Sequence, residues 1–311
     1  MKGWPHGGAN TLAIAAVERD TGLSKDTLRA WERRYGFPVP ARDDEGERAY
    51  TPADVQKLRL VKRLLDAGHR PGRIVPLSLP ELTQLAEQAV LPPMETGPAV
   101  MNADNAAAHL ALIRSHDVAA LRGALTRQWL GEGLEHFVID VLGPLNAVVG
   151  EAWMRGQLEI FEEHLYTESV QAVLRQALAA TPAPATAGQP RVLLTTFAGE
   201  QHGLGLLMAE ALLTLQGCRC VSLGVQTPLW DIVLAAAGCR SDIVALSFTA
   251  CLSPNQVING LTELRLKLPA SVQVWAGGSA PVLHRRPLPG VMPMASLQEL
   301  PAAVQRWRAG L

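Results

Sequence analysis

The chain has 311 residues, of which 48% are hydrophobic and 18% are charged. This composition is typical of globular proteins, and the length favours two or three domains that each bury a core. No apolar run approaches the roughly 20 residues of a membrane span, and the opening segment MKGWPHGGAN lacks the apolar core of a signal peptide. We therefore expect a cytoplasmic protein that has no membrane partner.

The net charge of −1 is unevenly distributed along the chain. Residues 1–78 carry 14 Lys and Arg against 10 Asp and Glu, whereas the remainder carries 14 against 19. A basic first segment favours an anionic polymer as partner, although the excess is small. The four cysteines, Cys218, Cys220, Cys239 and Cys251, form no C-x-x-C pair. They predict buried free thiols rather than a zinc site or a disulfide framework.

Two stretches have the composition of linkers. Residues 91–100 (LPPMETGPAV) and 181–190 (TPAPATAGQP) are rich in Pro, Gly, Ala and Thr and have no sustained periodicity. They predict three domains, at residues 9–78, 102–180 and 190–311.

The first domain begins as a short helix, a tight turn at TGLS and a second helix. Ser24 is suited to cap this second helix, and Asp26 adds negative charge to its first turn. The basic residues Lys25, Arg29, Arg33 and Arg34 surround the helix, as in a recognition helix that enters the major groove. A solvated charged helix is the alternative interpretation.

The segment FPVPARDDEGERAYTPADV predicts a β-ribbon wing followed by a third helix. The wing turns at residues 43–46, and the flanking Arg42 and Arg48 could contact phosphates. Thr51 and Pro52 mark the start of the third helix, which should stop at Gly68. The buried stripe of this helix is predicted to be Val55, Leu58, Val61, Leu64 and Leu65.

These elements, with TGLSKDTLRAWERRYGFPVPAR and RAYTPADVQKLRLVKRLLDAG in order, resemble the MerR family of winged helix-turn-helix regulators. The resemblance covers most of residues 9–78 and implies DNA binding by a symmetric oligomer at a two-part operator. The residues that it places at DNA are Lys25, Thr27, Arg29, Arg33, Arg34, Tyr35, Arg42 and Arg48.

The middle domain shows helical apolar patterns throughout and predicts a four-helix bundle. Trp153 lies near the end of one helix, and Glu163 and His164 lie on the next. Taken singly, these three residues are more simply explained as structural.

The last domain alternates strands and helices. Five strands, RVLLTTF, CRCVSLG, DIVALSF, SVQVWAGG and VMPMA, predict a doubly wound parallel sheet of the flavodoxin-like kind, with its ligand site at the strands' carboxyl ends. One such end is FAGEQHGLG, in which His202 is either a helix cap or a ligand.

Three elements at these strand ends resemble the cobalamin-binding signature of corrinoid enzymes and their regulatory relatives. They are Glu200-x-His202-x-x-Gly205, Ser247-x-Thr249 and Gly277-Gly278, separated by 41 and 27 residues. The resemblance implies that His202 is the lower axial ligand of cobalt, with its other nitrogen on Glu200, where enzymes of the group usually carry Asp. The cofactor-binding residues expected in this domain are Glu200, His202, Gly203, Gly205, Gly224, Thr227, Ser247, Thr249, Gly277 and Gly278.

The middle domain then resembles the adenosylcobalamin photoreceptors of the CarH and LitR type in its Trp153 and Glu163-His164 pair. This similarity spans all three domains and implies that Trp153, Glu163 and His164 cover the upper face of adenosylcobalamin. One departure is Met154, which stands where the best-known members carry a second cobalt-ligating histidine. His116, His136 or His164 could substitute for it.

The sequence as a whole predicts a DNA-binding regulator, most simply a repressor, that is controlled by adenosylcobalamin or another cobalamin and by light, and that acts as a homodimer or homotetramer. A regulator without light switching is the alternative, and Met154 is its main support. A corrinoid carrier of a methyltransferase or mutase is a third interpretation. This interpretation is disfavoured because the sheet domain is accompanied by a complete DNA-binding domain and not by a substrate-binding barrel. We therefore do not expect an enzyme.

Overall fold

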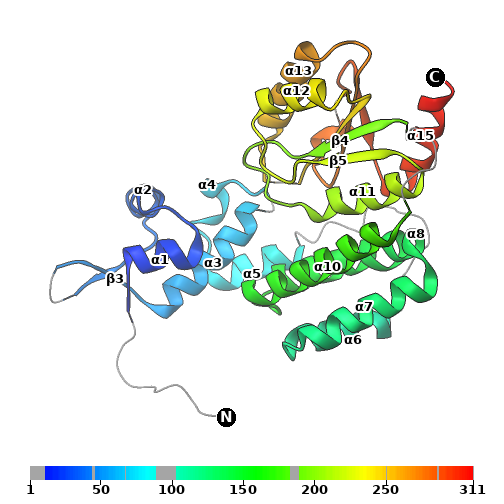
Figure 1. Cartoon of the computed structure of the whole chain (residues 1–311). Coiled ribbons are helices and arrows are strands. Elements are labelled where there is room, and N and C mark those ends of the chain that lie inside the picture. The colour runs from blue at the N-terminus through cyan, green and yellow to red at the C-terminus, as the bar shows by residue number, and fades with distance from the viewer. Residues whose placement is uncertain are drawn as a thin grey trace. The chain divides into compact units, whose positions relative to one another are not determined.

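The computed structural model describes residues 11–43, 46–66, 68–88, 103–182, 189–249, 251–285 and 287–310. They fall into two compact units (Figure 1). One unit comprises Met1–Leu91 with Met154–Gly156, and the other comprises Pro92–Trp153 with Gln157–Leu311. The linker predicted at residues 91–100 lies outside the described residues, as do most of the linker at 181–190 and the opening ten residues.

The first unit contains the predicted helix-turn-helix and wing. Its elements are β1 (Leu12–Ala13), α1 (Ile14–Thr21), α2 (Lys25–Tyr35), β2 (Ala41–Arg42), β3 (Arg48–Tyr50), α3 (Pro52–Asp66), α4 (Pro71–Ile74) and α5 (Leu79–Gln88). Antiparallel β2 and β3 form the wing, and β1, which the sequence analysis did not foresee, adds a third strand on the other side of β3. Residues 44 and 45 of the wing turn lie outside the described part.

Local signals set the ends of these helices. Gly22 ends α1 in the left-handed conformation with φ of 69°, which glycine adopts without strain. The Ser24 hydroxyl accepts the backbone N–H of Thr27 at 3.2 Å, which confirms Ser24 as the cap of α2. On α3, Thr51 Oγ1 accepts the N–H of Asp54 at 3.1 Å, and Pro52 is the first helical residue.

The core of the first unit forms beneath α1, α2 and α3. Leu28 and Trp31 are the only buried residues of α2, so its remaining surface is polar. The predicted stripe on α3 is confirmed at Val55, Leu58, Val61 and Leu64, which are at most 5% exposed, while Leu65 is half-buried. Because α2 uses so narrow an apolar face, most of its side chains are available to a partner.

The second unit begins with the predicted bundle of helices. Its members are α6 (Ala103–Arg114), α7 (Val118–Glu132), a continuous helical segment formed by α8 (Leu134–His136), the π-helical η1 (Phe137–Leu142) and α9 (Gly143–Met154), and α10 (Ile160–Ala180). Asp117 caps α7 by accepting the N–H of Ala120 at 2.9 Å. Glu159 and Glu162 form a reciprocal capping box at the start of α10.

The segment Leu134–Met154 has 21 residues and a mean hydropathy of 1.3, so by length and composition it could cross a membrane. The segment is not a continuous apolar run, because Glu135, Asp140 and Glu151 interrupt it. Its apolar character has a structural reason, because Phe137, Val141, Leu145 and Val149 are buried in the core that the bundle shares with the sheet domain.

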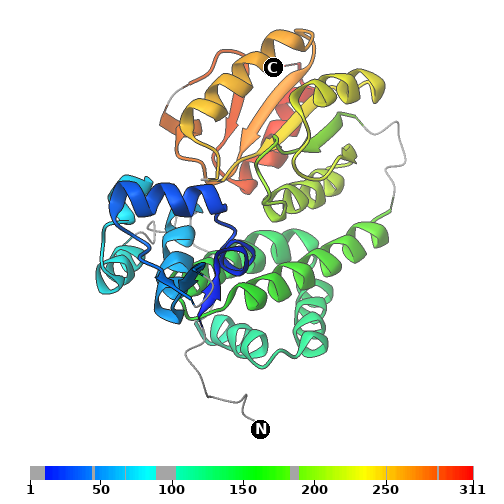
Figure 2. The ribbon, with the colours of Figure 1, turned by 90° about the vertical axis from the view of Figure 1, so that its left-hand side faces the viewer.

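The sheet domain has the predicted five parallel strands in the order β5-β4-β6-β7-β8. They are β4 (Arg191–Thr195), β5 (Arg219–Ser222), β6 (Ile243–Ser247), β7 (Gln273–Gly277) and β8 (Val291–Met294). The accompanying helices are α11 (Leu204–Leu215), α12 (Leu229–Gly238), α13 (Pro254–Lys267), α14 (Val282–Arg285), the 3₁₀ turn η2 (Leu297–Glu299) and α15 (Leu300–Arg308). Figures 1 and 2 show helices on both faces of this sheet, so the doubly wound fold is confirmed.

The central strands are apolar through their interiors, at Val192–Leu194, Ile243–Leu246 and Val274–Ala276, because both of their faces are covered. On β4, Val192 and Leu194 pack toward α11 and α15, whereas Leu193 packs toward α12 and α13. The bundle rests on the α11 side, where α10 and α11 are in contact and share one core. Asn146 accepts the Tyr166 hydroxyl at 2.5 Å and donates to the sulfur of Met208 on α11 at 3.2 Å, so a partly buried polar link joins bundle and sheet domain.

Candidate functional site

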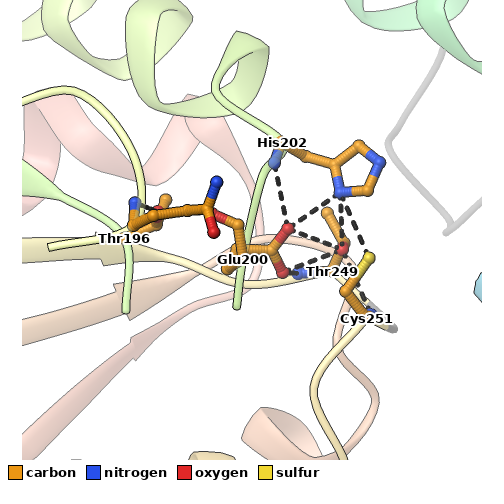
Figure 3. Close-up of polar contacts among 6 residues, drawn as sticks. Thr196, Glu200, His202, Thr249 and Cys251 are labelled. Carbon is orange, nitrogen blue, oxygen red and sulfur yellow. Dashed lines mark hydrogen bonds and ion pairs between the residues drawn. The ribbon is translucent and has the colours of Figure 1, made fainter. Parts of the chain in front are cut away.

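The loops that follow β4 and β6 meet at the carboxyl edge of the sheet. These two strands are neighbours, and β4 also pairs with β5, so the strand order reverses between β4 and β6. In sheets of this kind the reversal opens a crevice at the strands' carboxyl ends, where ligands bind. Figure 3 shows Glu200 and His202 from the first loop facing Thr249 and Cys251 from the second.

The Glu200 carboxylate lies at the centre of this meeting point and is fully buried. It accepts the backbone N–H of Thr249 at 2.7 Å, the Thr249 hydroxyl at 2.8 Å and the backbone N–H of His202 at 3.1 Å. Burial alone would raise the pKa of Glu200, but the hydrogen bonds from His202 and Thr249 outweigh it and lower the pKa. Glu200 is therefore a buried carboxylate whose charge is held by donors from two loops.

The His202 ring is oriented by this carboxylate. Its Nδ1 lies 2.8 Å from Glu200 Oε1, and the side chain is 57% exposed. Because an ionised carboxylate only accepts, Nδ1 carries the hydrogen, and Nε2 is left without a hydrogen-bond partner among the described residues. Hydrogen bonds with Cys251 and with Glu200 raise the pKa of His202 to about 10, against the lowering effect of burial. A metal at Nε2 must therefore displace a proton.

The structure excludes one of the two interpretations of His202, that of a helix cap. The N-cap of α11 is Gly203, and no side chain caps this helix. His202 instead has the geometry of a ligand whose Nδ1–H is held by a carboxylate, the arrangement that fixes tautomer and orientation in metal-binding histidines.

The glycines of the signature serve close packing around the site. Gly278 has φ of 107°, and a Cβ there would lie 2.2 Å from the carbonyl oxygen of Phe248. A Cβ on Gly205 would lie 3.4 Å from Ser247 Oγ, so the start of α11 approaches the end of β6 closely. A Cβ on Gly277 would meet Met294 at 3.3 Å, and one on Gly203 would meet Val225 at 3.0 Å.

We expect Gly278→Ala to lower the free energy of unfolding by on the order of 3 kcal/mol, because the added methyl overlaps backbone and the residue keeps a φ unfavourable for alanine. Gly238→Ala is the matched control, since nothing lies within 4 Å of its Cβ position at the end of α12. Urea unfolding of both variants measures the difference. Equal stability of the two would contradict the packing role of Gly278.

Gly224 and Thr227 belong to the loop after β5, which is tied to the end of β4. Thr195 Oγ1 donates to the carbonyl of Gly224 at 3.0 Å and lies 2.7 Å from Thr227 Oγ1. Thr196, which the sequence analysis did not single out, accepts the N–H of Gln226 at 2.8 Å and donates to the carbonyl of Glu200 at 2.7 Å. The neighbouring loop is thus fastened to the loop that carries His202.

Cys251 is the second residue that sequence reasoning left outside the site. The sequence predicted a buried free thiol, whereas the Sγ atom lies 3.4 Å from His202 Nδ1 and the residue is only half-buried. The available signal was its position two residues after Thr249, in the loop that follows β6.

In the bundle, Glu163 and His164 are the fourth and fifth residues of α10, and Trp153 is next to last in α9. Glu163 accepts the Thr167 hydroxyl at 2.7 Å, and its other oxygen lies 2.9 Å from His164 Nδ1. Trp153 is half-buried against the core shared with the sheet domain. The structure therefore brings Glu163 and His164 together on the bundle that packs on α11.

Three histidines were considered as replacements for the second cobalt-ligating histidine, whose position Met154 occupies, and they differ in their surroundings. His136 has Nδ1 2.8 Å from Asp140 and Nε2 3.2 Å from Glu132, so both of its nitrogens are engaged. His116 has Nε2 3.1 Å from Glu162. His164 is 70% exposed, and the described residues engage only its Nδ1. Of the three, His164 is the most exposed, and its Nε2 is not engaged by the described residues.

The predicted DNA-contacting residues of α2 divide into free and engaged side chains. Arg29, Arg33 and Arg34 are exposed. Arg29 lies 3.5 Å from Asp26, and Arg34 lies over the half-buried ring of Tyr35 at 5.4 Å. The remaining predicted contacts on this helix are partly shielded, with Lys25 3.8 Å from Glu18 and Thr27 Oγ1 2.8 Å from Ser24 Oγ.

Both arginines of the wing have partners within the unit. Arg42 donates to the carbonyl of Gly46 at 2.6 Å across the wing turn. Arg48 donates from Nε to Glu32 Oε2 at 2.9 Å and is 25% exposed in its side chain. Arg48 therefore fastens the wing to α2, a contact that the sequence analysis did not foresee.

Comparison with known proteins extends these observations to the whole chain. Residues 12–77 match the MerR HTH family regulatory proteins, and residues 106–178, which form the bundle, match the B12 binding domain. The chain is 35% identical over 277 residues to the HTH-type transcriptional repressor CarH of Myxococcus xanthus, covering 88% of this chain and 91% of that protein. This chain belongs to the CarH family of MerR-type transcriptional repressors.

A second member, the HTH-type transcriptional repressor CarA of Myxococcus xanthus, is 31% identical over 271 residues, which are 86% of each chain. The monomethylamine corrinoid protein of Methanosarcina barkeri has a similar fold, with a TM-score of 0.50 at 17% identity, covering 63% of this chain and 95% of that one. The expectation of a MerR-type, cobalamin-dependent transcription regulator rather than an enzyme is confirmed by the CarH family membership.

Proposed function

We propose that this CarH-family regulator binds adenosylcobalamin at the carboxyl edge of its sheet and represses transcription from a two-part operator in the cytoplasm, as a homodimer or homotetramer. The observation that carries the proposal is the Glu200–His202–Thr249 constellation, with its exposed and unengaged Nε2. Imidazole is a suitable cobalt ligand, and its carboxylate-bound Nδ1–H increases the basicity of Nε2.

The residues around His202 fit the cofactor in size as well as in chemistry. Gly205 and Ser247 are both small and lie against each other where the start of α11 meets the end of β6, so no bulky side chain stands at the place proposed for the cofactor tail. Besides its predicted contact with the cofactor, Thr249 donates two hydrogen bonds that hold the buried Glu200 carboxylate in place.

We further propose that light controls the regulator. Adenosylcobalamin supplies a Co–C bond that visible light breaks. Trp153, Glu163 and His164 would contact the adenosyl group from the bundle, so loss of that group removes contacts from the bundle side. A switch in DNA occupancy requires that the two cofactor states differ in affinity for the oligomeric conformation.

Met154 favours a second candidate function, a response to cobalamin that is independent of light. A thioether is a weaker ligand than imidazole for oxidised cobalt. A light-adapted state held by two protein histidines would therefore lack its second histidine in this chain. On this candidate function, cobalamin itself is the signal.

Size-exclusion chromatography with adenosylcobalamin, in darkness and after green light, separates the two candidates. We expect a dark oligomer that dissociates on illumination, with a changed visible spectrum in each peak. Met154→His is the matched variant, and it should stabilise the illuminated state. The light-independent regulator would be favoured if the unsubstituted protein binds the cofactor without changing size on illumination, while the Met154→His variant does change size. Absence of binding would overturn both candidates.

A further inference from the structure

Glu200, His202 and Cys251 form a cluster of three different metal-binding side chains. One ligand atom of each lies within 4.8 Å of the others, the one such convergence in the part of the chain that the structure describes. The residues come from the loops after β4 and β6, and Figure 3 shows their side chains turned toward one another. Nδ1 of His202 lies 3.4 Å from Cys251 Sγ and 2.8 Å from Glu200 Oε1.

We propose that the cobalamin-free protein binds one Zn²⁺ or similar thiophilic divalent ion through His202 Nδ1, Cys251 Sγ and a Glu200 oxygen. A tetrahedral zinc ion with bonds of about 2.0–2.3 Å separates its ligand atoms by about 3.4–3.6 Å. The Nδ1–Sγ distance already matches, and the Nδ1–Oε1 distance needs to lengthen by about half an ångström.

The donor set selects the class of ion. A thiolate, an imidazole and a carboxylate are zinc ligands, whereas Mg²⁺ and Ca²⁺ prefer oxygen alone. His202 is 57% exposed in its side chain, so water can reach the fourth position. Binding releases the Cys251 thiol proton and the Nδ1 proton of His202.

The other three cysteines are less suited to this role. Burial raises the pKa of Cys218 to about 11 and that of Cys220 to about 12. Cys239 follows the last residue of α12 and takes no part in the cluster. Cys239 is half-buried like Cys251, which makes it a matched control.

Zinc at this cluster and cobalt on His202 exclude each other, a consequence that rests on the proposed function. A neutral imidazole has one lone pair and one N–H. Cobalt on Nε2 leaves the one remaining ring hydrogen on Nδ1, where Glu200 accepts it, whereas zinc on Nδ1 leaves that hydrogen on Nε2 and so blocks the cobalt position. Zinc would therefore raise the cobalamin concentration that the regulator needs.

The direct test is a titration of the full-length, cobalamin-free protein with Zn²⁺ against a chromophoric chelator, repeated with Cd²⁺ to record thiolate-to-metal absorption. We expect one ion per chain. Cys251→Ser should lose the absorption and at least tenfold in affinity, and Cys239→Ser should keep both. No stoichiometric binding, or binding unchanged in Cys251→Ser, overturns the site.

Competition with adenosylcobalamin tests the exclusion separately. Cys251→Ser should still bind the cofactor, and Zn²⁺ should weaken cofactor binding in the unsubstituted protein but not in Cys251→Ser. Simultaneous binding with an unchanged cobalamin spectrum overturns the exclusion. If the unsubstituted protein binds zinc but no cobalamin, the proposed function fails while the zinc site stands.

Discussion

On the proposed function, in which His202 is the cobalt ligand, His202→Ala is expected to lower the affinity for adenosylcobalamin by on the order of 100-fold or more and to change its visible spectrum. Glu200→Gln should have a smaller effect, about 10-fold to 100-fold, since the imidazole remains but its orienting carboxylate is lost. Spectral titration in darkness measures both.

The structure gives a reason why Glu200→Gln is not conservative. Both oxygens of Glu200 accept hydrogen bonds, Oε1 from His202 and Oε2 from the N–H of Thr249. An amide must place its NH₂ group against one of these donors, which leaves a buried group unsatisfied at about 1–3 kcal/mol. We therefore expect a lower unfolding free energy together with weaker cofactor binding.

His284→Ala is the matched control for the histidine variant, because His284 is exposed on α14 of the same domain. It should bind the cofactor as the unsubstituted protein does. An unchanged spectrum and affinity in His202→Ala, with circular dichroism showing a folded chain, would show that His202 is not the cobalt ligand.

Arg33→Ala is expected to weaken operator binding by about 1–3 kcal/mol if Arg33 contacts a base. If Arg33 contacts a phosphate, the slope of log affinity against log salt concentration should fall by about one in magnitude. Arg33 is exposed on α2 and is not engaged by the described residues, so its removal should leave the unfolding free energy unchanged. Fluorescence anisotropy with operator DNA at several salt concentrations distinguishes the two contacts.

Arg48→Ala should behave differently, because Arg48 is bonded to Glu32 and joins wing to recognition helix. We expect weaker DNA binding together with a stability loss of about 1 kcal/mol. Arg306→Ala removes the same charge from an exposed position on α15 and should change neither property. An Arg33→Ala variant with the affinity of Arg306→Ala would exclude Arg33 from the DNA interface.

The sequence by itself determined the elements and their order. Helix starts were predictable at Ser24 and Thr51 because a cap is a contact between residues three apart. The five strands were predictable as short, mostly apolar segments, and the apolar runs are continuous inside the central strands, which are buried on both faces. Their alternation with helices was sufficient for a parallel doubly wound sheet, and the spacing of the signature placed His202 and Thr249 at strand ends.

Only the tertiary structure decided which of these residues touch. Glu200 and Thr249 are 49 residues apart, and their contact depends on β4 and β6 being neighbours. The same packing turns Cys251 toward His202 and Arg48 toward Glu32, pairs that are 49 and 16 residues apart in the sequence. Hydrophobic periodicity and helix-capping residues reflect interactions between residues that are close in the sequence. A site made by two loops depends instead on strand order and on how closely glycines such as Gly278 let those loops approach.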